Sequence, residues 1–292
     1  MIVIDWGTSS QRAWRLGANG GVLAAREAAR GILHVASGGF PEALEAIAGD
    51  WIAEGERRVL LSGMVGSRQG WVEAPYLDCP AGAAELAKAT VRAPYGPAAV
   101  LLVPGLSCRD EHGTPEVMRG EETQIAGLEA AFAAPGLACL PGSHSKWARV
   151  ESGRILSFRT YLSGEAFAAL KSATILGRMM SDGPVSEAAF DRGVARSGDS
   201  GHLLHHLFGV RALGLFGELA EADSASYLSG LLIGHETRAA LSRRERVHLI
   251  GAPKLAALYA RAIAACGGEP AIEDSEAARR GLARIGEKVA WD

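Results

Sequence analysis

Two short hydroxyl-rich turns in the sequence carry residue types that can bind phosphate. The first is Asp5-Trp6-Gly7-Thr8-Ser9-Ser10, and the second is Gly142-Ser143-His144-Ser145-Lys146. Glycine lets backbone N–H groups approach phosphate oxygens, hydroxyls add donors, and a carboxylate suits Mg²⁺. Each turn alone is also typical of an ordinary polar hairpin that satisfies its own backbone. Two matching turns together favour a polyphosphate that is held from two sides.

An acidic motif, Met118-Arg119-Gly120-Glu121-Glu122, lies between the two turns. Acids are favourable at a helix N-terminus, which is the structural interpretation of this run. The functional interpretation makes one glutamate a general base on a substrate hydroxyl, or a magnesium ligand. Arg119 would then bind either a phosphoryl group in transfer or the acid group of a substrate.

Two glycine-containing segments complete the list of candidate sites. The loop SGMVGSRQGW ends in Trp71 and carries the polar side chains of Ser67, Arg68 and Gln69. Arg and Gln suit a polyhydroxy acid, whereas the alternative is a flexible surface loop with one packed tryptophan. Gly251 follows the apolar run RVHLI and precedes a helical pattern, so it would let a flat ring approach the backbone or would only serve packing.

The elements that must position these residues repeat along the chain. Apolar alternation predicts a three-stranded meander over 2–28, and the pattern restarts at Pro135-Gly136 with strands over 137–140, 146–151 and 155–162. We therefore expect two similar α/β domains, spanning 1–133 and 134–292. The first would hold the first phosphate turn and the loop over 62–71, and the second would hold the second turn and Gly251. Apolar residues at helical spacing, namely Phe40, Leu44, Ile47 and Trp51, predict a helix over 40–54. We also expect a helix over 117–133, opening near Glu121, and a last helix with Ser275 at its N-cap.

Composition excludes several classes of protein. The chain has 292 residues, 48% of them hydrophobic and 22% charged, and a formal net charge of −3. A nucleic-acid-binding protein would need a basic surface. No apolar run is long enough to span a membrane, and four cysteines without a metal-ligand spacing are typical of a reduced cytoplasmic protein. His202, His205 and His206 are interpreted as a patch at a helix terminus rather than a metal cluster.

The duplicated meanders and their turns resemble the actin, hexokinase and Hsp70 superfamily of ATP-binding folds. Longer stretches are similar to the 2-dehydro-3-deoxygalactonokinase family: IDWGTSSQRAWRL, SGMVGSRQGWVEAPYLDCPA, VMRGEETQIAGL, LPGSHSKW and LIGAPKLAALYARAI. The resemblance covers essentially the whole chain. It implies two duplicated ribonuclease-H-like α/β domains with an ATP cleft between them. It also implies ATP-dependent phosphorylation of the 6-hydroxyl of 2-dehydro-3-deoxy-D-galactonate in bacterial galactonate or galactose breakdown.

The family pattern assigns roles to residues of this chain. Asp5 would order Mg²⁺, and Gly251 would lie beside the adenosine. The phosphate turns would be formed by Gly7, Thr8 and Ser9 and by Gly142, Ser143 and His144. Arg68, Gln69 or Arg159 would fix the substrate carboxylate, because a guanidinium matches a carboxylate in a bidentate way. The sequence is compatible with a homodimer.

One departure from the wider superfamily changes the search for the catalytic acid. Pro141 stands where an aspartate usually precedes the glycine of the second turn. Exopolyphosphatases of the superfamily carry a Gly-Glu-Glu run ahead of that turn, and this analogy favours Glu121 or Glu122 as the base, with Arg119 alongside. Two alternatives remain: a polyphosphate or nucleotide phosphohydrolase of the same fold, and a noncatalytic ATP-binding regulator, although no basic DNA-binding module is visible.

Overall fold

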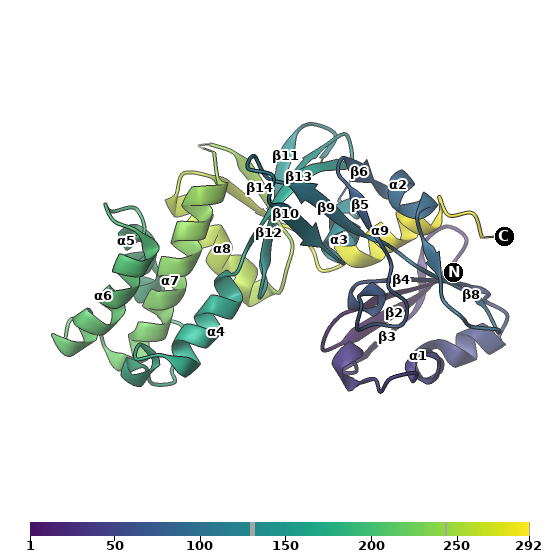
Figure 1. The fold of residues 1–292 in the computed structure, drawn as a ribbon, viewed down its shortest axis with the longest axis horizontal. Coiled ribbons are helices and arrows are strands. Elements are labelled where there is room, and N and C mark those ends of the chain that lie inside the picture. The colour runs from purple at the N-terminus through teal and green to yellow at the C-terminus, as the bar shows by residue number, and fades with distance from the viewer. Residues whose placement is uncertain (129–131, 243, 292) are drawn as a thin grey trace. The chain divides into compact units, whose positions relative to one another are not determined.

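The computed structural model describes residues 1–128, 132–242 and 244–291 (Figure 1). These residues form two compact units. The first comprises 1–135, 148–158 and 274–292, and the second comprises 136–147 and 159–273. The main break at Pro135 and Gly136 lies close to the boundary that the sequence predicts, but the C-terminal segment 274–292 belongs to the first unit.

The principal sheet of the first unit begins with the predicted meander. Its strands follow the order β3-β2-β1-β4-β8-β7, with bounds β1 (Ile2–Trp6), β2 (Gln11–Leu16), β3 (Val22–Ala28), β4 (Arg58–Ser62), β7 (Val91–Arg92) and β8 (Ala99–Leu102). β1 pairs antiparallel with β2 and parallel with β4, and β4 pairs parallel with β8. Asp5 is thereby placed opposite Ser62, at the carboxyl ends of two neighbouring parallel strands.

Two helices pack in the core of the first unit. α1 (Phe40–Ala53) starts with proline in its first turn and buries the predicted stripe of Phe40, Leu44, Ile47 and Trp51. α9 (Ala277–Gly286) packs on α3 (Glu121–Ala126) at very short range: a Cβ on Gly281 would lie 1.7 Å from the carbonyl oxygen of Thr123. Only glycine permits this approach, which fixes α3 and its acidic first turn.

A small three-stranded sheet ends just before α3, and its pairing shows that the helix predicted over 117–133 starts later than expected. Its order is β10-β9-β5, with bounds β5 (Tyr76–Asp78), β9 (Gly105–Arg109) and β10 (Pro115–Met118). The helix predicted over 117–133 begins only at Glu121, because Val117 and Met118 pair with β9. Residues 129–131 of that prediction lie outside the described residues. The short β6 (Ala81–Gly82) and α2 (Ala83–Lys88) follow β5 and also belong to this unit.

The last helix differs from the prediction in its first turn. α9 begins at Ala277, its N-cap is Glu276, and no side chain makes the capping hydrogen bond. The prediction of Ser275 as the N-cap is therefore wrong, because the turn over Asp274–Glu276 is instead closed by the Asp274 carboxylate, which accepts from the Glu276 N–H at 2.9 Å.

The six-stranded sheet that contains the second meander repeats the strand order of the first six-stranded sheet. Meander strands β11 (Gly136–Leu140), β12 (Ser145–Glu151) and β13 (Arg154–Tyr161) are followed by β14 (Arg246–Leu249) and β15 (Glu269–Ile272) in the order β15-β14-β11-β12-β13, with β6 at the edge. β11, β14 and β15 run parallel. The two sheets thus share a meander followed by two parallel strands, which confirms the predicted duplication.

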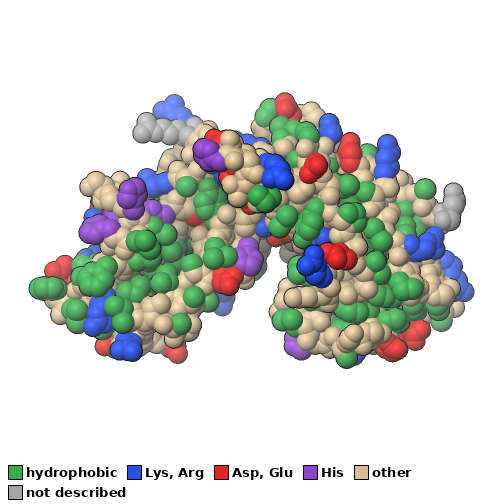
Figure 2. Space-filling view, in the orientation of Figure 1, with side chains coloured by type: hydrophobic (Ala, Val, Ile, Leu, Met, Phe, Trp, Pro, Cys, Tyr) green, Lys and Arg blue, Asp and Glu red, His purple; other side chains and the backbone are tan. Residues whose placement is uncertain are grey.

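Helices make up most of the second unit: α4 (Ser163–Ala173), α5 (Glu187–Arg196), α6 (Leu203–Leu215), α7 (Glu221–Ala240) and α8 (Pro253–Ala265). α5 and α7 approach through glycines, since a Cβ on Gly230 would lie 2.0 Å from the carbonyl oxygen of Phe190. The described helices include none that is long and apolar enough to cross a membrane. On the face shown in Figure 2, acidic and basic side chains are interspersed rather than gathered into one basic surface.

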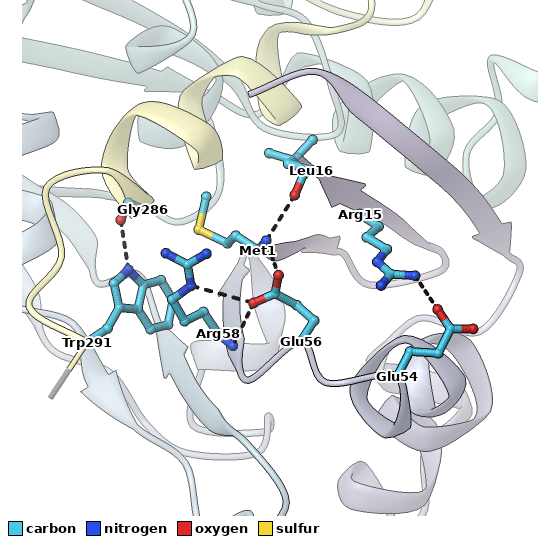
Figure 3. Close-up of polar contacts among 8 residues, drawn as sticks. All are labelled: Met1, Arg15, Leu16, Glu54, Glu56, Arg58, Gly286 and Trp291. Atoms are coloured by element: carbon cyan, nitrogen blue, oxygen red, sulfur yellow. Dashed lines mark hydrogen bonds and ion pairs between the residues drawn. The ribbon is translucent and has the colours of Figure 1, made fainter. Parts of the chain in front are cut away.

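Polar contacts hold the amino end of β1, opposite the end that carries Asp5 (Figure 3). The Met1 amino group donates to the Leu16 carbonyl at 3.0 Å and to Glu56 at 2.5 Å. Partial burial acts to raise the pKa of Glu56, but the hydrogen bonds from the Met1 amino group and the Arg58 N–H, with the positive charges of both residues, hold that pKa below its usual range. These contacts hold the amino end of the strand in place, and Asp5 lies toward the other end.

Candidate active site

The first phosphate turn is closed by its own backbone and leaves its hydroxyls in solvent. The N–H of Gly7 donates to the Ser10 carbonyl at 2.9 Å, while the side chains of Thr8 and Ser9 are exposed. Gly31 lies directly against the turn, because a Cβ there would be 2.3 Å from the Ser9 nitrogen. Sequence inspection missed Gly31, whose importance depends on a contact between distant segments.

Asp5 lies beside this turn with one carboxylate oxygen engaged. Arg12 donates to its Oδ2 at 2.7 Å, and the Asp5 side chain is 17% exposed. Its Oδ1 lies near Gly63, where a Cβ would be 3.5 Å away. A partly buried carboxylate oxygen at the end of a strand, next to a donor-rich turn, has the chemistry that Mg²⁺ requires of a protein ligand.

The loop over 62–71 and the acidic motif over 118–122 meet next to Asp5. Gly63 has φ +96° and Gly120 has φ +106°, the left-handed region that favours glycine. A Cβ on Gly120 would lie 3.3 Å from the Gly63 Cα, and a Cβ on Gly63 would lie 2.8 Å from the Trp6 carbonyl oxygen. The loop after β4 and the start of α3 are therefore brought together with the end of β1.

Glu122 is completely buried in this part of the first unit. Its carboxylate accepts from the Gly120 N–H at 2.7 Å and from the Thr123 hydroxyl at 3.1 Å. The Thr123 hydroxyl is in turn 2.7 Å from the Ser62 hydroxyl on β4. Burial, together with the neighbouring Glu121 charge, raises the pKa of Glu122 to about 7, and the hydrogen bonds to its carboxylate oppose this rise. The partly exposed Glu121 accepts from the Arg119 N–H at 2.9 Å.

The loop over 62–71, which is predicted to bind the sugar acid, is ordered by hydrogen bonds. The Trp71 N–H donates to the Val65 carbonyl at 2.8 Å, and Trp71 stacks on Phe40 with ring centroids 6.3 Å apart. Ser67 is half-buried, whereas Gln69 is exposed and Arg68 is 88% exposed, 3.6 Å from Glu73. Arg159 is exposed on β13 in the second unit, so the structure does not place it with the loop.

The second phosphate turn connects β11 and β12, and α4 begins against it. A Cβ on Gly164 would lie 2.3 Å from the Gly142 carbonyl oxygen, and the Glu165 N–H donates to the Ser143 carbonyl at 3.0 Å. The exposed His144 ring lies 2.5 Å from the Glu165 carboxylate. Ser143 and His144 are exposed, as expected of a turn that offers donors to a ligand.

A buried polar network behind this turn was not found from the sequence. Ser145 and Tyr259 share a hydrogen bond of 2.7 Å, and Tyr259 donates to Glu236 at 2.9 Å. Trp147 donates to the other Glu236 oxygen at 2.7 Å. Burial raises the pKa of Glu236, and these hydrogen bonds oppose the rise. A glutamate within an apolar helix, in LSGLLIGHE, is the signal that would have revealed it.

A mostly apolar pocket of about 300 Å³ lies in the second unit next to this turn. Its walls come from α4, α5, α7 and α8, and they include Gly142 and Gly164. Such a pocket beside a donor-rich turn suits a flat base attached to phosphates. Gly251 is not part of the lining; it lies against Pro141, whose carbonyl oxygen would be 3.5 Å from a Cβ there. The predicted contact of Gly251 with adenosine remains a prediction, as does the cleft between domains.

The donor set agrees with a magnesium ion that is bound mainly by substrate. Among the described residues, no group of three or more His, Cys, Asp or Glu side chains forms a metal cage. Mg²⁺ in phosphoryl-transfer sites is usually held by one or two carboxylates together with phosphates and water. Asp5, with its Oδ1 directed toward Gly63, fits that arrangement.

Two solved structures define the class of protein. A crystal structure from Sinorhizobium meliloti, named as a "putative 2-dehydro-3-deoxygalactonokinase protein", matches with a TM-score of 0.90 and 37% identity over 97% of both chains. An activator of 2-hydroxyisocaproyl-CoA dehydratase from Clostridium difficile matches with a TM-score of 0.50 over 99% of this chain and 95% of its own, at 13% identity, which shows the fold alone. The duplicated sheets and their turns thus define an α/β protein with the two-domain fold of actin, hexokinase and Hsp70.

Curated relatives identify the particular family. A Rhizobium meliloti (strain 1021) protein named "Probable 2-dehydro-3-deoxygalactonokinase" is 38% identical over 96% of this chain and 94% of its own. The 2-dehydro-3-deoxygalactonokinase of Escherichia coli (strain K12) is 33% identical over 99% and 98%. The family model for 2-keto-3-deoxy-galactonokinase matches residues 5–285. The chain therefore belongs to the 2-keto-3-deoxy-galactonokinase family, and it is a kinase.

Proposed function

We propose that this kinase transfers the γ-phosphoryl group of ATP to the 6-hydroxyl of 2-dehydro-3-deoxy-D-galactonate, in galactonate breakdown. The observation that carries the proposal is the meeting of the Gly63 and Gly120 motifs beside Asp5, at the carboxyl ends of β1 and β4. In parallel α/β sheets, ligands bind at those ends of the strands.

The two turns and the apolar pocket supply the binding of ATP in this proposal. Thr8 and Ser9 would donate to phosphate oxygens, and Gly7 would let the phosphate approach the backbone of the first turn. Gly142, Ser143 and His144 would do the same in the second unit. The apolar pocket would take the adenine ring, a flat group that gains from burial against Phe167 and Leu232. Asp5 would hold Mg²⁺, which supplies charge neutralisation on the phosphates.

Glu121 and Glu122 take different roles in this proposal. Glu122 is 0% exposed and accepts from Gly120, which supports a positioning role for it. Glu121 is partly exposed in the same helical turn, so it would accept the proton of the substrate hydroxyl. Glu121→Gln should then lower kcat far more than it changes KM. An unchanged kcat in that variant would reject Glu121 as the base.

An ADP-release assay tests the proposed activity. We expect ADP formation only when a 2-keto-3-deoxy sugar acid is present, with the galactonate-derived acid used faster than its gluconate-derived epimer. ADP formed at one rate with or without sugar acid would indicate a phosphohydrolase instead. ATP binding without any turnover would indicate a regulator.

Two further expectations concern assembly and location. Exposed apolar side chains on and after α6, namely Leu204, Phe208 and Phe216, are those that a homodimer contact would cover, and Figure 2 shows hydrophobic side chains over this region. Light scattering would test for the dimer. A cytoplasmic location agrees with four free cysteines.

A further inference from the structure

Arg119 is a buried cation whose surroundings come from the loop after β4. Arg119 directly follows β10, and it is 9% exposed. Nη2 donates to the Ala74 carbonyl at 2.8 Å, and the guanidinium carbon lies 4.4 Å from the centroid of the Tyr76 ring. A Cβ on Gly66 would lie 3.2 Å from Nη1. The guanidinium is therefore enclosed by residues 66–76.

Most of the donor capacity of this guanidinium is unused. Nε and Nη1 are buried and have no hydrogen-bond partner. Within the described part of the chain, no ion pair joins Arg119 to a carboxylate, although salt bridges elsewhere in the first unit are common. A buried charge without a counter-ion is strongly unfavourable, and proteins retain such groups where a ligand completes them.

A second unused donor lies in the same loop. The Ser67 hydroxyl is buried and has no partner, and Ser67 directly follows Gly66, which lies against the guanidinium. Arg68, the next residue, is 88% exposed and lies near Glu73. The loop therefore directs Arg68 to solvent and keeps the Ser67 hydroxyl inside.

We propose that Arg119, together with Ser67, binds the carboxylate of the sugar acid, an inference that rests on the proposed function. The contacts of Arg119 come from segment 66–76, whereas the phosphate donors of this unit lie in the turn at 7–10, so two different segments would bind the carboxylate and the phosphates. A planar carboxylate fits a guanidinium and supplies the missing counter-charge. Binding would require Gly66 and Ser67 to move, because Nε and Nη1 of Arg119 and the Ser67 hydroxyl are all buried.

Three variants and a matched control test this assignment. Arg119→Lys keeps the charge, Arg119→Met removes it, and Ser67→Ala removes one donor. Arg109→Met is the control, since Arg109 is an exposed arginine of the same unit that donates only to the Gly113 carbonyl in the described contacts. Circular dichroism checks the fold, and calorimetry measures binding of the sugar acid and of its C1 carboxamide, independently of turnover.

The expected result is a selective loss of carboxylate recognition. Both Arg119 variants should weaken binding of the acid, and raise its KM, by about tenfold to a hundredfold, the range for hydrogen bonds to charged groups. The KM for ATP should change less than about twofold, a ratio within the scatter of surface substitutions. Ser67→Ala should give a smaller loss, and Arg119→Met should no longer prefer the acid to the carboxamide.

Several outcomes would overturn the inference. Unchanged acid binding in folded Arg119→Lys and Ser67→Ala would do so, as would a KM for ATP that rises equally, which would assign Arg119 to the phosphates. A large loss in Arg68→Ala alone would move the carboxylate to Arg68. Wild-type protein that binds the acid through Arg119 but forms no ADP would refute the proposed function while supporting the carboxylate site.

Discussion

Glu122 should make the stability of the protein fall as pH rises from about 5 to 8. The carboxyl group is fully buried, and burial raises its pKa from 4.5 to about 7. Below pH 4.5 both the folded and the unfolded chain hold the proton, so no penalty exists. Between these values the folded chain keeps the proton that the unfolded chain has lost, and stability declines with pH. Above pH 7 both states are ionised and the whole burial cost is present.

The size of this effect follows from the two pKa values. A change from 4.5 to about 7 corresponds to about 3 kcal/mol in total, most of which falls between pH 5 and pH 8. Glu122→Gln has no titrating group at this position, so its free energy of unfolding should lack this decline. Relative to wild type, the variant should gain about 2–3 kcal/mol over that range, whatever its offset at pH 5.

Urea unfolding followed by circular dichroism at several pH values measures this difference. Glu42→Gln is the matched control, because it removes an exposed carboxylate of α1 in the same unit. Parallel pH profiles for wild type and Glu122→Gln would refute the burial argument. A wild-type profile that rises more steeply than that of the variant would show that the carboxylate is stabilised in its ionised form.

Three other substitutions test the remaining parts of the site. Asp5→Asn should keep the fold and lower kcat at least about a hundredfold, because charge stabilisation at the phosphates is lost; wild-type turnover would remove Asp5 from the magnesium site. Gly63→Ala should cost about 1–3 kcal/mol or more, since its φ of +96° with ψ of −154° adds to contact with the Trp6 carbonyl; Gly20→Ala, with φ +74° and open space, should cost less, and equal costs would exclude the contact. Ala225→Trp should fill the apolar pocket and raise the KM for ATP but not for sugar acid; an unchanged KM for ATP would place adenine elsewhere.

Local patterns were sufficient to predict most elements of the fold. Alternation in 2–28 gave the meander, and the apolar stripe of 40–54 gave α1. The start of α3 was misplaced because Val117 and Met118 pair with β9, and tertiary pairing overrides the local helical pattern. The Ser275 cap failed for a similar reason, since Asp274 closes that turn instead.

The candidate site was less accessible to sequence inspection, because its geometry depends on long-range contacts. The motifs around Gly63 and Gly120 were recognised separately, but nothing local indicates that their backbones touch. Glu236 was missed because a buried acid in an apolar helix is only meaningful once Trp147 and Tyr259 are seen to donate to it. Spacing also could not distinguish the exposed Arg68 from the buried Arg119.

The identity of the phosphorylated product tests the central claim most directly. Purified protein, ATP, Mg²⁺ and 2-dehydro-3-deoxy-D-galactonate should give one ADP for each phosphomonoester, with ³¹P NMR coupling that places the phosphate on the 6-oxygen. Release of inorganic phosphate without a sugar phosphate, or a phosphate on any other oxygen, would contradict the account.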